Sequence, residues 1–189
     1  SHYSVKEYER LLKHYFSNST MQQTVKPVIV TSVDIVNKIP FLFASFPQLN
    51  PVKDALFMWE AARATSAAPI YFKPFKINVD SEDRVLVDGG VGINNPSVLG
   101  LVAAKKYYPE KKIIMLSLST ETKSKSSVYR TGGAFGGGAL SSKKGSFNLQ
   151  SIIDNLLEVP SANNHFIMGE LLKSDKSHYY RVRSSAAQT

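Results

Sequence analysis

The 189-residue sequence contains no cysteine. Disulfide bonds and thiolate metal sites are therefore excluded. Its histidines are few and scattered, and no two of them have the spacing of a metal-binding motif. They are His2, His14, His165 and His178. We therefore expect no metal site and no cofactor.

Long apolar runs are also missing, and no stretch is long enough to cross a bilayer as a helix. The first residues, "SHYSVKEYER", include no initiator Met and no signal-type segment, so the native start is expected upstream. With 43% hydrophobic residues the composition suits one globular domain over residues 1–189. We expect a soluble protein, either cytoplasmic or secreted, that is at most peripheral to membranes.

Positive charge is in excess, because 23 Lys and Arg residues face 15 Asp and Glu residues, a net charge of +8. This excess favours anionic partners, such as an anionic membrane surface. The basic residues are dispersed, however, which is more typical of a solvated surface. No nucleic-acid-binding motif appears, so no nucleic acid partner is expected.

Outside the central part of the sequence, helix signals are clear in four places. Ser4 and Glu7 have capping-box spacing, which predicts a helix over Val5–Phe16. A second helix should begin with Asn50 as cap and Pro51 at its first position, and end near Ser66. Two more helices are expected at Asn148–Glu158 and Ala162–Leu172. Trp59 and its alanine-rich neighbours are predicted to pack in the core.

Strand signals alternate with these helices. "KPVIVTSVDIV" is rich in β-branched residues and predicts an interior strand, and "HYYRVR" predicts a short final one. "IPFLFASFP" is broken by Pro40 and Pro47 and is interpreted as a hydrophobic loop, either buried or a lipid-facing lip. Residues 121–147 are rich in Ser, Lys and Gly and predict a flexible loop.

The central stretch "RVLVDGGVGINNP" ends a predicted strand in a carboxylate, Asp88. Asn95 and Pro96 then have the cap pattern of a following helix, and "KIIMLSLST" predicts the next strand. Strand, turn, helix and strand in this order predict a βαβ unit with parallel strands. The sequence therefore favours an α/β fold with Asp88 at the carboxyl end of a strand, where functional groups collect.

Gly89 and Gly90 follow Asp88 directly. Glycine permits positive φ and lets another group approach where a Cβ would interfere, so this pair suits a carboxylate held rigidly at a cleft. The alternative is that Asp88 merely caps a turn, because Asp-Gly pairs are common turn formers. The dipeptide alone does not decide between these interpretations.

Three segments in order resemble the patatin-like phospholipases: "WEAARATSAAPIYF" (Trp59–Phe72), "LVDGGVGINNP" (Leu86–Pro96) and "KIIMLSLST" (Lys112–Thr120). The resemblance implies a three-layer α/β/α fold with a mostly parallel central sheet. It also implies a Ser–Asp dyad that hydrolyses lipid acyl esters. The acid of the family's D-G-[GA] motif falls on Asp88, with Gly89 and Gly90 as its supporting residues.

The family's nucleophilic serine lies in a G-x-S-x-G turn, and no serine here has those flanking glycines. The glycine-rich stretch Gly132–Gly138 follows Asp88, whereas the family's oxyanion loop precedes the serine. We therefore expect a C-terminal portion of the catalytic domain, incomplete in this chain and inactive alone. An upstream segment, present in the same protein or as a second chain, would carry the serine. The alternative is an inactive module that binds anionic lipid surfaces or a protein partner.

Overall fold

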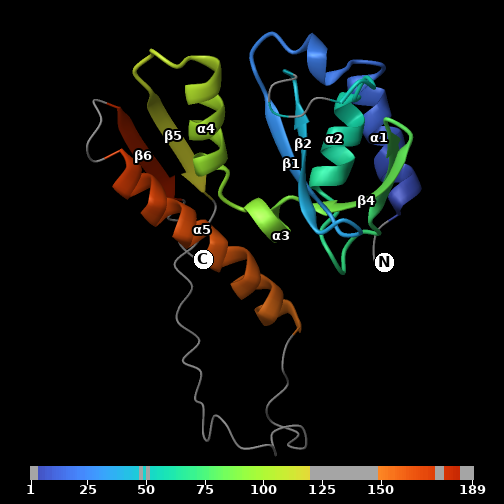
Figure 1. Ribbon diagram of the computed structural model, residues 1–189. Coiled ribbons are helices and arrows are strands. Elements are labelled where there is room, and N and C mark those ends of the chain that lie inside the picture. Colours follow the sequence, from blue (N-terminus) through green and yellow to red (C-terminus); the bar gives the residue numbers. More distant parts are fainter. Residues whose placement is uncertain (1–3, 47–48, 50–51, 120–148, 173–176, 184–189) are drawn as a thin grey trace, which may run out of the picture.

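The computed structural model describes residues 4–46, 49, 52–119, 149–172 and 177–183. Its helices and strands form an α/β fold in two parts, which Figure 1 shows side by side. One part contains β1 to β4 with α1 and α2, and the other contains α4, β5, α5 and β6. The short helix α3 (Gly90–Ile93) lies between them and contacts both β1 and α5.

The first helix, α1 (Val5–Phe16), has the predicted bounds. The Ser4 hydroxyl accepts a hydrogen bond from the backbone N–H of Glu7, which satisfies one of the free donors at the helix start. The helix packs against α2 (Met58–Thr65). Lys13 lies over the ring of Trp59, 4.2 Å from its centroid, so the sole tryptophan is covered by the first helix.

The larger sheet has four strands in the order β2-β1-β4-β3. They are β1 (Ile29–Asp34), β2 (Ile39–Ala44), β3 (Phe75–Val79) and β4 (Glu82–Asp88). Every neighbouring pair is antiparallel, so the α/β fold is present but the expectation of a mostly parallel central sheet was wrong for these four strands. As predicted, β1 is an interior strand, since it pairs with β2 on one side and β4 on the other.

The expected hydrophobic loop is in fact strand β2, so that prediction was wrong. Pro40 is tolerated because β2 is an edge strand, where a missing N–H need not break a ladder. Phe41, Phe43 and Phe46 are buried, which excludes the lipid-facing lip for these side chains. Phe41 and Phe43 belong to a core shared with α2 and β3.

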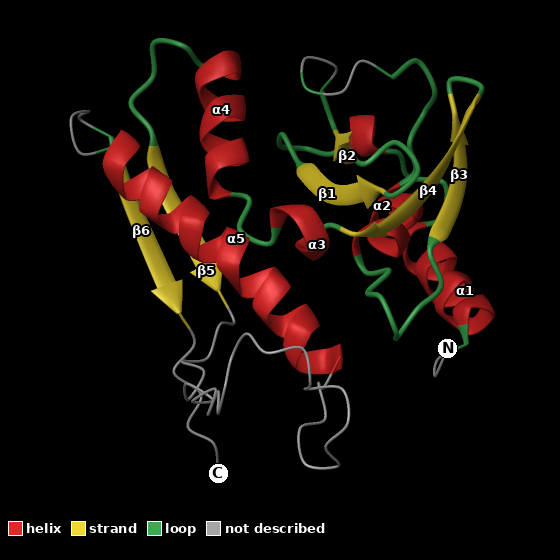
Figure 2. Ribbon diagram, turned by 60° about the horizontal axis from the view of Figure 1, so that its bottom comes forward, coloured by secondary structure: helices red, strands yellow, loops and turns green. Residues whose placement is uncertain are grey.

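The second part contains α4 (Ser97–Tyr107), β5 (Ile114–Ser119), α5 (Leu149–Leu171) and β6 (His178–Arg183). β5 and β6 are parallel and form a separate two-stranded sheet. Its core is small: Leu101, Met168 and Leu172 are buried between the helices and one face of the strands. Figure 2 shows α5 crossing this sheet.

Three further expectations need correction. β4 and β5 lie in different sheets, so they do not form the predicted parallel βαβ unit, and parallel pairing occurs only between β5 and β6 in the described residues. The helix expected from Asn50 begins at Met58. The two helices expected after residue 148 are one helix, α5, which continues through Pro160. The loop predicted at residues 121–147 lies outside the described residues.

Candidate active site at the end of β4

Asp88 is the last residue of β4, as the sequence predicts. Its Cα lies opposite that of Ser32 on β1. Its backbone N–H donates to the carbonyl of Ala67, 3.1 Å away, in the loop that follows α2. Ala67 is fully buried and presents only a methyl group. Two of the three sequence segments that carry the family resemblance therefore meet at the backbone of Asp88.

The carboxylate of Asp88 is half-buried and sparsely hydrogen-bonded. Its Oδ1 accepts the backbone N–H of Gly90 at 2.7 Å, and Oδ2 accepts no hydrogen bond from any described residue. Burial raises the pKa of the Asp88 carboxyl, and the hydrogen bond from Gly90 lowers it by less. One fixed oxygen and one free oxygen with raised basicity are what a general base requires.

Gly89 is required for close approach and not for positive φ. Its φ is −60°, in the right-handed helical region, so of the two properties of glycine that the sequence suggested here, only the close approach is used. A Cβ on Gly89 would overlap the carbonyl oxygen and hydroxyl of Thr31 and lie 2.6 Å from the Thr31 carbonyl carbon. The contact with β1 therefore holds the chain directly after Asp88.

A buried polar network holds the segment that follows Asp88 at its other end, where α4 begins. The Oδ1 of Asn95 accepts the N–H and the hydroxyl of Ser97, at 3.1 and 2.6 Å, so Asn95 holds the start of α4 although the helix begins at Ser97, one residue later than predicted. Its Nδ2 donates to the carbonyl of Ser161 on α5. Arg181 on β6 donates to the hydroxyls of Ser117 and Ser161, at 2.8 and 3.0 Å.

This network was not predicted from the sequence, because its members lie on four elements that are distant in the chain. The available signal is the pattern of β5 and β6. The inward positions of these two strands include the polar residues Ser117 and Arg181 beside the apolar Met115 and Tyr179, while the outward neighbours of Ser117 and Arg181 are apolar. Polar residues at inward positions of a strand must find partners, so this pattern indicates a buried polar cluster.

Arg181→Met should lower the free energy of unfolding by about 2 kcal/mol, because it leaves two buried hydroxyls without their charged donor. The exposed pair of Arg10 and Glu7 supplies the control. Arg10→Met removes an equal charge and should cost less than about 0.5 kcal/mol. Urea unfolding of both variants measures the difference, and equal costs would contradict a stabilising role for the network.

None of the described serines is placed as the nucleophile. Ser32 lies beside Asp88, but it is fully buried and its hydroxyl donates to the carbonyl of Val87 at 2.6 Å. Ser66 donates to the carbonyl of Ala62 at 2.7 Å, and Ser117 belongs to the Arg181 network. No described serine or histidine side chain forms a hydrogen bond with the Asp88 carboxylate.

Asp34, at the end of β1, is a second strand-terminal aspartate, but its surroundings are opposite in kind. It is fully buried, and it accepts hydrogen bonds from Asn37, Val36 and Arg84. Burial raises the pKa of the Asp34 carboxyl, but these hydrogen bonds together outweigh burial, so the pKa lies below its ordinary value. Asp34 is therefore a structural carboxylate.

Asp34→Asn should lower the free energy of unfolding by about 2 kcal/mol at neutral pH. A depressed pKa means that the carboxylate stabilises the fold above the unfolded-state pKa and that this stabilisation is lost as the pH falls through the folded-state pKa. The difference in unfolding free energy between wild type and variant should therefore become smaller in acid. Thermal unfolding from pH 7 downward measures it, and a gap independent of pH would contradict the assignment.

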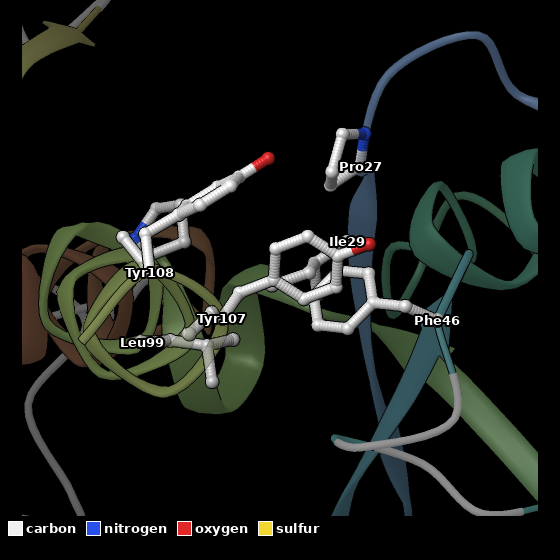
Figure 3. A pocket seen from close by; sticks show the side chains of 10 residues that line it. Pro27, Ile29, Phe46, Leu99, Tyr107 and Tyr108 are labelled. Carbon is white, nitrogen blue, oxygen red and sulfur yellow. The ribbon is translucent and has the colours of Figure 1, made fainter. Parts of the chain in front are cut away.

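A pocket of about 340 Å³ opens between the first sheet and α4. Ile29 and Phe46 line one side, and Leu99 and Tyr107 line the other (Figure 3). The rings of Phe46 and Tyr107 meet edge to face, with centroids 5.2 Å apart. The lining is mostly apolar and does not include Asp88, so this pocket does not form the surroundings of the carboxylate.

Within the described ranges, no group of three or more His, Asp and Glu side chains is placed to hold a metal ion. Over the same ranges, none of the helices is both long and apolar enough to cross a bilayer.

Sequence comparisons identify the class of protein. A family model described as "Patatin-like phospholipase" matches residues 2–99, which is just over half of the chain and includes Asp88 and its glycines. The chain belongs to the patatin-like phospholipase family.

Two similar proteins come from one plant. The chain is 27% identical over 197 residues to "Probable inactive patatin-like protein 9" of Arabidopsis thaliana, covering 97% of this chain and 49% of that protein. It is 32% identical over 121 residues to "Patatin-like protein 6" of the same plant, covering 59% and 24%. The chain therefore spans half or less of the length of these relatives.

Proposed function

We propose that this chain supplies the general base of a lipid acyl hydrolase of the phospholipase A type. Asp88 would be that base, and a segment outside this chain would supply the serine. The observation that carries the proposal is the Asp88 carboxylate. It is fixed through Oδ1 by Gly90, its Oδ2 is free of described donors, and burial raises its pKa.

The reaction would proceed in two balanced steps. The serine oxygen attacks the acyl carbonyl while Asp88 takes the serine proton, and the proton then passes to the departing alcohol. Water next attacks the acyl-serine, Asp88 accepts its proton and returns it to the serine oxygen, and the fatty acid leaves. A carboxylate suits both steps because it stays close to the reacting oxygen and is more basic than an exposed aspartate.

A second candidate function, that of an inactive binding module, is supported by a separate observation. The relative that matches 97% of this chain is named "probable inactive". An inactive patatin-fold module would bind anionic lipid surfaces through its net charge of +8, or bind a protein partner. It predicts vesicle binding that weakens with added salt, and no ester hydrolysis by the full protein.

The test is hydrolysis of a p-nitrophenyl acyl ester and of phospholipid vesicles by the product of the whole gene, compared with its Asp88→Asn variant. Activity that disappears in the variant supports the hydrolase. Activity that persists refutes Asp88 as the base. No activity in either protein, together with salt-sensitive vesicle binding, supports the inactive module.

A further inference from the structure

One face of the two-stranded sheet is mostly apolar, and none of the described residues covers it. β5 and β6 pair in register, with Ile114 opposite His178, Leu116 opposite Tyr180, and Leu118 opposite Val182. All six side chains are exposed. The exposed fractions of the five large apolar ones are 69% for Ile114, 61% for Leu116, 73% for Leu118, 56% for Tyr180 and 53% for Val182.

The opposite face is covered. Met115 and Tyr179 alternate with the exposed residues and pack against the core of Leu101, Met168 and Leu172, which α4 and the end of α5 supply. Figures 1 and 2 show both helices beside this sheet. The described helices therefore cover only one face of this two-stranded sheet. We call the six exposed side chains the β5–β6 face.

Such a face is unusual for a parallel sheet. Parallel strands are almost always buried on both faces, and a two-stranded sheet is at best marginally stable alone. In the described part of the chain, each of the two strands has a strand partner on one edge only. Contiguous apolar patches on a protein surface mark contact with another surface. The β5–β6 face is therefore expected to be covered by something.

We propose that the β5–β6 face is covered by the polypeptide segment that bears the nucleophile. This identification of the occupant rests on the proposed function. Its independent support is length, because this chain spans only 49% of the relative that matches nearly all of it. A second segment of similar size is thus available in that relative to complete the two-sided burial that the strands require.

The chemistry of the face favours a folded polypeptide over a membrane. None of its six positions carries Lys, Arg, Asp or Glu. A surface that binds anionic lipid would carry basic side chains among its apolar ones. Alternating branched and aromatic residues without charge are instead typical of an interior sheet face.

Cysteine protection tests the proposal, because this chain has no native cysteine and Leu→Cys is a mild change. Leu116→Cys places a thiol on the β5–β6 face. Val102→Cys places one on α4, where Val102 is 53% exposed and does not belong to the face. Maleimide labelling, located by peptide mass spectrometry, is measured in this chain alone and in the product of the whole gene.

We expect the thiols of both variants to react at similar rates in the chain alone. In the whole protein, the Leu116→Cys variant should react at least 100-fold more slowly than the Val102→Cys variant. Leu116→Lys should also lower the melting temperature of the whole protein by on the order of 10 °C, because it buries an unpaired charge, while Val102→Lys should change it little.

Several outcomes would overturn the proposal. Fast labelling of the Leu116→Cys variant in the whole protein shows an uncovered face, and a mature protein no longer than this chain has no covering segment. Protection that disappears on dilution identifies a second copy, and protection that needs phospholipid vesicles identifies a membrane. None of these results depends on hydrolysis, so a failure of Asp88→Asn to abolish activity would refute the proposed function and leave this measurement intact.

Discussion

Asp88→Asn is expected to reduce ester hydrolysis by the whole protein by about 10²- to 10⁴-fold, the usual contribution of a positioned general base. The amide keeps an oxygen that can accept the N–H of Gly90, so the turn should persist. It cannot take a proton from a serine. Initial rates with a p-nitrophenyl ester, measured at saturating substrate, report the loss in kcat.

Asp83→Asn is the matched control. Asp83 lies on the same strand, β4, and undergoes the same chemical change, but it is exposed and its carboxylate accepts a hydrogen bond from Asn78. Its rate should stay within about twofold of wild type, because surface substitutions of this kind change stability little. Equal losses in both variants would mean that a change of charge, and not the loss of a base, causes the effect.

The stability of Asp88→Asn provides a second readout. Because burial raises its pKa, the folded state disfavours ionised Asp88. The ionised carboxylate therefore lowers stability at neutral pH, and the fold recovers that stability as the pH falls through the folded-state pKa. The variant should melt no lower than wild type at pH 7, and any advantage should vanish in acid. A large fall in the melting temperature of the Asp88→Asn variant at pH 7 would indicate that Asp88 is a structural residue like Asp34.

Local signals explain which elements could be predicted. The bounds of α1 and β6 agree with the sequence prediction, since a serine cap and a short run rich in tyrosine and valine act over a few residues. Strand β2 was missed because Pro40 argues against a strand unless that strand lies at an edge. Strand direction was also missed, because it depends on which distant segment pairs with which.

For the candidate site too, the sequence predicts what depends on local pattern and misses what depends on which strands pair. A strand that ends in an acid and is followed by glycines places Asp88 from local pattern alone. The reason for Gly89 was only half predicted: the close neighbour exists, but its identity, Thr31, depends on how β1 and β4 pair. The contrast between Asp88 and Asp34 could not be predicted, since both end strands and they differ in burial and in hydrogen-bond donors, which depend on the tertiary structure.

Gly89→Ala is expected to be the most destabilising single-methyl change at this site. The added Cβ would overlap the carbonyl oxygen of Thr31, a backbone atom of the interior strand β1 that cannot rotate away. Overpacking of this kind costs about 3 kcal/mol, a fall in melting temperature on the order of 10 °C for a chain of this size. Relief requires β1 and β4 to separate, which would displace Asp88.

Gly169→Ala is the control, because a Cβ at Gly169 in α5 meets nothing within 4 Å. Alanine favours a helix over glycine, so this variant should gain about 0.5–1 kcal/mol. Opposite signs for the same added methyl would show that the close contact with Thr31, and not the loss of glycine as such, sets the cost. Differential scanning calorimetry measures both. If the Gly89→Ala variant melts within about 2 °C of wild type, strand β1 can move aside at little cost in stability. The turn would then not hold Asp88 rigidly enough for a general base.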